Sequence, residues 1–587
     1  MADFSTCQVF DLPNLIQIKT DLIRANKECS RRKLLNSAKW AAELSSAVDA
    51  SVDYQQILLL QEPKDYYDEY DKFALASSYF DLKEYDRAVY FLQECSSSNN
   101  YFLYLYGRYL ADEKRKVDNA SDSIGPPDHL ENEHLKTLKI ELSKKYIMKE
   151  LDGFCLYLYG IVLKKLDLLK EALEMLVEAV NYEPLHWGAW LELAILIPDK
   201  ETLLSLSLPN HWMKNLFLGH MYLELQLNEE ALKIYQGLVD GGFSKSTYIV
   251  SQMAVVYHNM REIDMSVTAF AELQELDPYR LENMDTYSNL LYIKEMRADL
   301  AHLAHRCCDI DKYRVETCCV IGNYYSLRQQ HEKAVMYFQR ALKLNPHYLS
   351  AWTLMGHEFM ELKNTSAALQ AYRQAIEVNR RDYRAWYGLG QTYEILKMYH
   401  YCLYYYRQAQ QLRPNDSRMV VALGESYEKL ERLQEAKKCF RKAHSIGDVE
   451  GMAIIKLAKL HERLSEETHA AAAYTEYVNE ANRQGIFNPE DLSQAYKYLA
   501  NFNFAQGQLD EAYAAAQKCT EFQETREEAK VILRNIQDLR SKKETISDIR
   551  MDDSCGSITT ERFHGADHTP ISSLSPVNLR FTPGDSC

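Results

Sequence analysis

The stretch that decides the fold is VETCCVIGNYYSLRQQHEKAVMYFQRALKLNPHYLSAWTLMGHEFMELKNTSAALQAYRQAIEVNRRDYRAWYGLGQTYEILKM, residues 315–398. Together with the residues that follow up to Asp448, it divides into four segments that align at a spacing of 34 residues. Small or aromatic residues recur at five aligned positions. These positions hold Cys318, Trp352, Trp386 and Val420; Gly322, Gly356, Gly390 and Gly424; Ala334, Ala368, Cys402 and Ala436; Phe338, Tyr372, Tyr406 and Phe440; and Ala341, Ala375, Ala409 and Ala443.

This period and this pattern are typical of the tetratricopeptide repeat, in which each unit is a pair of antiparallel helices. The small residues allow the two helices of a unit to cross closely, and the aromatic residues fill the space between neighbouring units. A single unit cannot bury its apolar face alone, so units stack into an array. We therefore expect an all-α fold, a tetratricopeptide-repeat superhelical solenoid with a long inner groove, followed by a disordered C-terminal tail.

Weaker copies of the pattern extend the array on both sides of this stretch. We expect N-terminal helices and a linker over residues 1–68, and N-terminal repeats over residues 69–290. The C-terminal repeats and a capping helix should cover residues 291–540. A charged segment near 111–132, which contains Gly-Pro-Pro, predicts an inserted loop. Residues 541–587 are rich in Ser, Thr, Asp, Gly and Pro, which predicts the disordered tail.

Composition excludes several classes of protein. The formal charge of −16 disfavours a general nucleic-acid binder, because such proteins need a basic surface to displace counterions. We find no secretory signal and no apolar stretch approaching the length of a membrane span, so no membrane partner is expected. The 13 cysteines have no metal-site or disulfide spacing, and Cys307, Cys402 and Cys519 occupy small-residue positions of repeats. They are expected to be reduced and to pack as small apolar residues.

The sequence contains no recognisable catalytic site, cofactor site or metal site. The pair Gly388-x-Gly390 lies at repeat positions within a helix, which favours packing over a phosphate-binding loop. His461 and His469 are eight residues apart without an acidic partner pattern, so they do not indicate a metal ligand set. In the tail, three Ser/Thr-Pro pairs are possible phosphorylation sites, at Thr569, Ser575 and Thr582.

Specificity is expected in the groove, which the first helix of each repeat lines. At the groove-facing positions the chain has polar and partly acidic residues instead of a uniform Lys/Glu mixture. Amides such as those of Asn323 and Gln391 suit a peptide backbone, and carboxylates suit an Arg or Lys side chain. The predicted peptide-binding residues are Asn289, Tyr292, Asn323, His357, Glu361, Arg384, Tyr387, Gln391, Glu394 and Glu428. The alternative is a groove face that is simply solvated.

The residues between the repeat positions are similar to a particular family. The stretch 315–398 closely resembles the cell division cycle protein 23 subunits, or tetratricopeptide-repeat subunits 8, of the anaphase-promoting complex (cyclosome). LDGFCLYLYGIVLKKLDLLKEAL (residues 151–173), LHWGAWLELA (185–194), SKSTYIVSQMAVVYHNMREID (244–264) and DPYRLENMDTYSNLLY (277–292) share this resemblance. It extends over most of residues 70–540 and includes surface residues, so it is more specific than the repeat pattern.

The resemblance implies a non-catalytic scaffold subunit of a multi-subunit ubiquitin ligase that controls mitotic progression and exit, in nucleus and cytoplasm. It also implies a homodimer through the N-terminal repeats, contacts with related repeat subunits, and a groove that docks the N-terminal motif of a coactivator of the cell division cycle 20 type. Two alternatives remain open: a repeat scaffold of an unrelated intracellular assembly, and a co-chaperone adaptor. A sugar transferase with repeats is disfavoured, because such an enzyme needs a large catalytic domain after the array.

Overall fold

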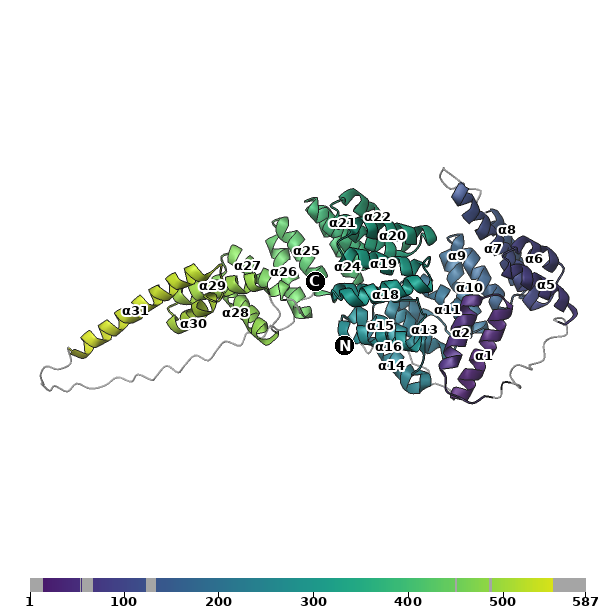
Figure 1. The fold of residues 1–587 in the computed structure, drawn as a ribbon, viewed down its shortest axis with the longest axis horizontal. Helices are drawn as coiled ribbons and strands as arrows, with labels where there is room; N and C mark the ends of the chain where they lie inside the picture. Colours follow the sequence, from purple (N-terminus) through teal and green to yellow (C-terminus); the bar gives the residue numbers. More distant parts are fainter. Residues whose placement is uncertain are drawn as a thin grey trace. The chain divides into compact units, whose positions relative to one another are not determined.

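The computed structural model describes residues 14–52, 54, 67–122, 133–448, 451–484 and 488–552. In these ranges the regular structure is helical and contains no β-strand. None of the helices described is long and apolar enough to cross a membrane. The chain divides into two compact units, residues 1–414 and residues 415–587. The all-α repeat fold expected from the sequence is confirmed (Figure 1).

The first unit begins with helices that precede or open the array. These are α1 (Leu15–Arg31), α2 (Leu35–Ala47), α5 (Tyr70–Asp81), α6 (Tyr85–Leu92), α7 (Ser98–Asp122), α8 (Glu133–Ile147), α9 (Gly153–Lys165), α10 (Leu169–Tyr182), α11 (Trp187–Leu196), α12 (Lys200–Ser205), α13 (Met213–Glu224), α14 (Asn228–Leu238), the π-helical turn η2 (Val239–Phe243), α15 (Thr247–Met260) and α16 (Ile263–Leu276). The unit continues with α17 (Met284–Ile293), α18 (Arg297–Ile310), α19 (Val315–Leu327), α20 (His331–Leu344), α21 (Leu349–Glu361), α22 (Thr365–Val378), α23 (Tyr383–Ile395) and α24 (Tyr399–Leu412).

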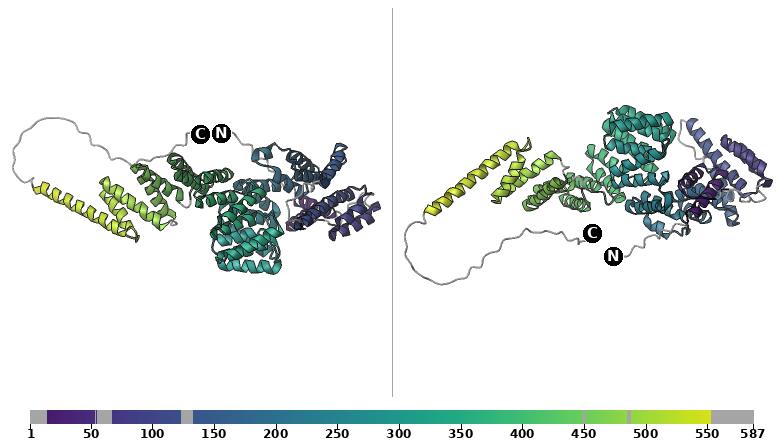
Figure 2. Two further views of the ribbon diagram at one scale, coloured as in Figure 1. Left: turned by 90° about the horizontal axis from the view of Figure 1, so that it is seen from above. Right: turned by 60° about the horizontal axis from the view of Figure 1, so that its bottom comes forward.

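The second unit contains the last repeats and the final helix. Its elements are α25 (Ser417–Lys429), α26 (Leu433–Ile446), α27 (Met452–Arg463), α28 (Glu467–Gln484), α29 (Pro489–Ala505), α30 (Leu509–Cys519) and α31 (Arg526–Asp552). The four segments aligned in the sequence therefore each form one helix pair, from α19–α20 to α25–α26, as predicted. Within the first unit, successive pairs stack side by side (Figure 2).

Glycine and aromatic positions meet at the helix crossings. A Cβ atom added to Gly322 would lie 2.5 Å from the ring of Phe338, and one added to Gly356 would lie 2.5 Å from the ring of Tyr372. Gly388 approaches the same Tyr372 ring from the next repeat, at 2.6 Å. The Gly388-x-Gly390 pair is thus a packing feature, because Gly388 contacts Tyr372 and Gly390 contacts Tyr406.

The turn between the two helices of each repeat also follows the 34-residue period. One residue with left-handed backbone conformation, φ between 54° and 67°, occurs in each turn. These residues are Arg261, Glu295, Gln329, Lys363, Lys397, Glu431 and Ser465. None is glycine, although this conformation costs an ordinary residue about 1–2 kcal/mol. The regular array thus extends beyond the four segments that the sequence shows clearly.

Two irregularities interrupt the period in the first unit. Gln226, which has φ 62°, precedes Arg261 by 35 residues, and η2 accommodates the extra residue with Gly242 at φ 107°. A second irregularity is the short helix α12, which has six residues and ends at Ser205. Such a local insertion changes how adjacent pairs stack without ending the array.

Two boundaries differ from the prediction. The loop expected near 111–132 is wrong for its first half, since α7 continues to Asp122. An ion pair between Lys116 and Asp112 at 3.0 Å, one helical turn apart, supports this continuation. The capping helix does not end at residue 540, because α31 continues to Asp552. The rest of the expected loop (123–132), residues 1–13, most of the linker and the tail from residue 553 lie outside the described residues.

Candidate peptide-binding groove

The predicted groove residues lie on the first helices of four successive pairs in the first unit. Asn289 and Tyr292 are on α17, Asn323 is on α19, and His357 and Glu361 are on α21. Four more are on α23, namely Arg384, Tyr387, Gln391 and Glu394. Glu428 belongs to α25 in the second unit, where it forms an ion pair with Arg463 at 2.5 Å. The expected set therefore divides between the two compact units.

Asn323 joins two repeats from a buried position. Its side chain is 3% exposed, and its Nδ2 atom donates hydrogen bonds of 2.7 Å to Ser288 Oγ and to Asn289 Oδ1. Both acceptors lie on the preceding first helix, α17. The amide that sequence analysis offered to a peptide backbone is already engaged inside the protein, and its loss would leave buried polar atoms without partners.

A second polar contact links α19 to α21. Ser326 Oγ donates to Glu358 Oε1 at 2.7 Å, and His331 Nδ1 lies 2.8 Å from Glu358 Oε2. Glu358 is 6% exposed, and burial raises the pKa of its carboxyl although the hydrogen bonds from Ser326 and His331 act in the opposite direction. This carboxylate, which sequence analysis did not select, holds two adjacent repeats together.

A third contact links α21 to α23. Thr353 Oγ1 donates to Asp382 Oδ2 at 3.0 Å, and Asp382 caps α23 by accepting the backbone N–H of Arg384 at 3.2 Å. The Arg384 guanidinium lies 3.1 Å from Asp382 Oδ1. Asp382 is buried, and its charge raises the pKa of Arg384, so the guanidinium stays charged. Arg384 is thus partly neutralised within its own turn.

Other predicted residues are held by aromatic side chains of the second helices. His357 Nδ1 lies 2.8 Å from the Tyr372 hydroxyl, and Tyr406 donates to Glu394 Oε2 at 2.9 Å. Burial, together with the nearby charge of Arg384, lowers the pKa of His357 to about 4, so its imidazole is neutral at pH 7. The ring of Tyr387 packs against Tyr406 with centroids 5.3 Å apart.

Three predicted residues remain accessible to a ligand. Tyr292 is 38% exposed, and Glu361 and Gln391 are also exposed. The Tyr292 hydroxyl lies 3.4 Å from Ser326 Oγ, and the exposed part of its ring can contact another molecule. An exposed aromatic ring, a carboxylate and an amide can together bind a short peptide that carries a basic and an apolar side chain.

Sequence reasoning missed the buried polar partners of this face. Glu358 occupies the aligned position that holds Tyr324, Thr392 and Ser426 in the other repeats. The carboxylate at a position that otherwise holds smaller or aromatic residues was the sequence signal that could have indicated a buried polar contact. Its partner Ser326 lies 32 residues earlier, and Asn323 lies 35 residues after Ser288. Two polar residues separated by about one repeat length, at groove-facing positions, therefore indicate such a contact between neighbouring repeats.

Buried cysteines occupy small-residue positions of the repeats. Cys307, Cys402 and Cys519 are free and buried, and burial raises the pKa of each thiol to about 11. They therefore remain protonated and pack as small side chains. Among the described residues, no group of three or more His, Cys, Asp and Glu side chains is placed to hold a metal ion. Thr569, Ser575 and Thr582 lie outside the described residues.

Comparison with known families gives two kinds of match. Residues 17–254 match the family model described as Anaphase promoting complex subunit 8 / Cdc23. Models of the tetratricopeptide repeat match residues 315–348, 356–395, 383–416 and 417–446. The first match includes the N-terminal helices α1 and α2, which the general repeat models do not cover. The family-model match therefore rests on sequence features beyond the general repeat pattern.

Known relatives agree with the family model. Over 306 residues the chain is 58% identical to the Cell division cycle protein 23 homolog of Bos taurus, and the aligned region covers 51% of each chain. The Homo sapiens homolog is 57% identical over 306 residues, again 51% of each chain. The chain thus spans about half the length of the curated relatives it matches.

A solved structure supports the fold. The crystal structure of the APC/C hetero-tetramer Cut9-Hcn1 matches with a TM-score of 0.53 and 16% sequence identity, covering 89% of this chain and 99% of that chain. At this identity the likeness shows the repeat fold alone. The family-model match and the relatives above show that this chain is similar to the anaphase promoting complex subunit 8 / Cdc23 family over about half of its length.

Proposed function

We propose that this chain is a non-catalytic scaffold subunit of the anaphase-promoting complex, a multi-subunit ubiquitin ligase of nucleus and cytoplasm. The observation that carries the proposal is the match of residues 17–254 to the subunit 8 / Cdc23 family model. The repeat fold supports it, because an array of helix pairs offers long surfaces for several neighbouring subunits. The partners in this proposal are related repeat subunits, a second copy of the chain and a coactivator.

The test is a ubiquitination assay with the complex depleted of this chain. We expect ubiquitin-chain formation on a mitotic substrate to fall at least tenfold and to return when purified chain is added back. Adding back an unrelated tetratricopeptide array of similar length is the control. If depletion leaves the rate unchanged, the scaffold role in this ligase is wrong.

An apolar surface on the first repeat supports a homodimer through the N-terminal half. On α5, α6 and the residues that flank them, large apolar side chains are exposed, which a contact with another protein molecule would cover. They are Tyr67 at 61%, Tyr70 at 50%, Leu75 at 39%, Leu82 at 68%, Tyr90 at 72% and Phe91 at 37%. A second copy of the same face would cover it by an isologous contact.

Replacing Tyr90 by glutamate is expected to convert the dimer into a monomer. A carboxylate introduced at this face would be buried without a partner on both sides of the symmetric contact. Light scattering at micromolar concentration measures the mass, and Tyr313→Glu, at a tyrosine that is 62% exposed outside this face, is expected to remain dimeric. A wild-type chain that is monomeric under these conditions contradicts the dimer.

The exposed residues of the groove support docking of a coactivator motif of the cell division cycle 20 type. We expect Glu361→Lys combined with Gln391→Ala to raise the Kd for a synthetic peptide of that motif at least tenfold. The first change places a positive charge against the basic side chain of the peptide, and the second removes a backbone partner. Fluorescence anisotropy measures the Kd, and circular dichroism checks that helicity is unchanged.

Glu377→Lys is the matched control for the charge. Glu377 is exposed on α22, the second helix of the same pair, and therefore lies away from the groove face. This variant is expected to bind the peptide with wild-type affinity. Equal Kd values for the double variant and the wild type would show that the peptide does not bind at α21 and α23.

A further inference from the structure

Helices α1 and α2 form a hairpin that lies along the first helices of the N-terminal repeats. Repeats normally pack on their neighbours in the sequence. The hairpin instead contacts residues from Asp152, before α9, to Glu282, before α17. Its contacts fall on or next to the first helix of each of these pairs, which is the side that lines the groove. The face of the repeats α9–α17 that these contacts cover is called the N-terminal inner face; α1 and α2 lie beside α10 and α11 in Figure 1.

Apolar side chains of the hairpin are buried against this face. Ile18, Leu22 and Leu44 are fully buried in the same cluster as Trp212 and Phe217 of the repeats. Trp40 stacks on Trp187 with ring centroids 4.5 Å apart and an interplanar angle of 8°. The ring of Tyr248 closes the other side of Trp40, edge-on at 5.7 Å. Tryptophan anchors in a well-packed surface are typical of binding interfaces.

Two glycines of the repeats allow the hairpin to approach closely. A Cβ atom added to Gly188, at the start of α11, would lie 2.8 Å from Ser37 Oγ, which accepts the Gly188 backbone N–H at 3.1 Å. One added to Gly242 would lie 2.7 Å from Leu15 Cδ2. The repeats thus lack a side chain at one position close to α2 and at one position close to α1.

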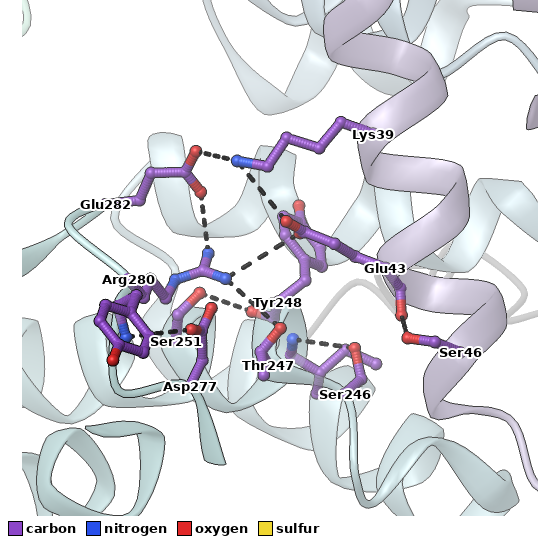
Figure 3. A network of polar contacts seen from close by, with 12 residues as sticks. Lys39, Glu43, Ser46, Ser246, Thr247, Tyr248, Ser251, Asp277, Arg280 and Glu282 are labelled. Carbon is purple, nitrogen blue, oxygen red and sulfur yellow. Dashed lines mark hydrogen bonds and ion pairs between the residues drawn. The ribbon is translucent and has the colours of Figure 1, made fainter. Parts of the chain in front are cut away.

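A network of charged residues joins α2 to the loop before α17 (Figure 3). Lys39 Nζ lies 2.5 Å from Glu282 Oε1 and 3.5 Å from Glu43. Arg280 forms ion pairs with Glu282 at 3.1 Å and with Glu43 at 3.9 Å. Burial opposes the charges, yet the hydrogen bond between Lys39 and Glu282 raises the pKa of the lysine and lowers that of the glutamate. Both groups are therefore charged at neutral pH.

Polar contacts also fix the other helix and the turn of the hairpin. Trp212 Nε1 donates to Asp21 Oδ2 at 3.2 Å, and the Arg32 guanidinium lies 4.0 Å from the centre of the Phe154 ring. Lys33, in the turn between α1 and α2, pairs with Asp81 at the end of α5 at 2.8 Å. This last contact places the hairpin next to the helix that follows it in the sequence, which favours occupation by the chain's own hairpin.

We infer that the N-terminal inner face is a binding site for an amphipathic helical hairpin with a tryptophan anchor and a lysine, and that residues 14–48 of the same chain occupy it. The site is distinct from the exposed groove residues of α17, α21 and α23. Because the hairpin fills the face, a segment of another protein enters this part of the groove only by displacing it. The repeats of α9–α17 are thereby reserved for an internal ligand.

The experiment uses the full chain with a protease recognition sequence inserted between residues 54 and 67. After cleavage of the native protein, the N-terminal fragment is held only by its non-covalent contacts with the repeats. We expect the fragment to co-elute with the repeats in size-exclusion chromatography, and its dissociation rate follows from serial runs. Separation of the wild-type fragment at the first run overturns the proposal.

Charge variants test the site itself. Lys39→Glu is expected to accelerate dissociation at least tenfold, and Lys39→Glu with Glu282→Lys is expected to return the rate to within threefold of wild type. Ala42→Glu, on the exposed side of α2, is the matched control and should not change the rate. If the reversed pair dissociates as fast as Lys39→Glu alone, the assigned contact is wrong.

The monomeric variant Tyr90→Glu distinguishes internal occupation from exchange between copies. In the cleaved monomer the fragment is expected to remain bound, because its site lies in the same chain. Loss of the fragment from the monomer, but not from the dimer, would instead show that the hairpin is exchanged between subunits. The retention of the fragment does not depend on the ligase assignment, so the two proposals fail independently.

Discussion

Replacing Gly356 by leucine is expected to lower the free energy of unfolding of the first unit by about 3 kcal/mol. A Cβ atom at this position lies 2.5 Å from Cε1 and 2.7 Å from Cζ of Tyr372. The ring is fully buried and is also in contact with Gly388 of the next repeat, so it has no space to move away. The leucine side chain must therefore separate α21 from α22. Urea denaturation followed by circular dichroism measures the effect.

Gly237→Ala is the matched control for this substitution. Gly237 also lies within a helix, α14, but a Cβ atom there meets no other atom within 4 Å. Because alanine favours helix formation, this variant is expected to be more stable by about 0.5–1 kcal/mol. A Gly356→Leu protein with wild-type stability would show that the two helices do not cross as closely as described.

Replacing Asp382 by alanine is expected to lower the free energy of unfolding by roughly 2–3 kcal/mol. The change removes the N-cap of α23, which typically contributes about 1 kcal/mol. It also removes a charged acceptor of the hydrogen bond from Thr353, and hydrogen bonds to charged groups contribute about 1.5–3 kcal/mol. The contact between α21 and α23 is weakened, and Arg384 loses the carboxylate beside it.

The conservative variant Asp382→Asn separates these contributions. Its side-chain oxygen still caps the helix and accepts one hydrogen bond, so about half of the stability is expected to return. Urea denaturation of both variants under the same conditions gives the comparison. Equal stability of Asp382→Ala and the wild type would mean that this buried carboxylate does not link the repeats.

The helix pairs of the array could be predicted because their determinants are local. The glycine that meets an aromatic ring lies 16 residues before it in the same unit, as Gly356 does before Tyr372, and both positions recur every 34 residues. The period also gave the position of each turn, although it did not show that residues such as Lys397 adopt a left-handed conformation there. Packing inside one repeat is thus readable from the sequence of that repeat.

The state of the groove residues could not be predicted in the same way. Whether Asn323 is available to a ligand depends on Ser288 and Asn289 of the previous repeat, which accept both of its hydrogen bonds. His357 and Glu394 are similarly held by tyrosines of second helices. The position of a residue in the repeat predicts the direction of its side chain, but it does not predict which neighbouring residues form hydrogen bonds with it.

Contacts between distant segments were beyond the reach of the pattern. The hairpin of α1 and α2 was expected as helices, and the residues it meets lie up to 243 residues away, as for Lys39 and Glu282. The charged segment after Ala111 was predicted as a loop, yet Asp112 and Lys116 pair along the continuing helix α7. Alternating charges at helical spacing support a helix even where apolar periodicity is absent. The division at residue 290 into a dimerising and a docking half concerns partners and stays a prediction.

Purification of the tagged full chain from dividing cells, followed by mass spectrometry, tests the central claim most directly. The account predicts that the other subunits of the anaphase-promoting complex, including related repeat proteins, are recovered in defined ratios to the chain. The Tyr90→Glu chain, purified in parallel, is expected to recover them in reduced amount, because it lacks the dimer contact. Recovery of a different assembly, with none of these subunits, would contradict the account.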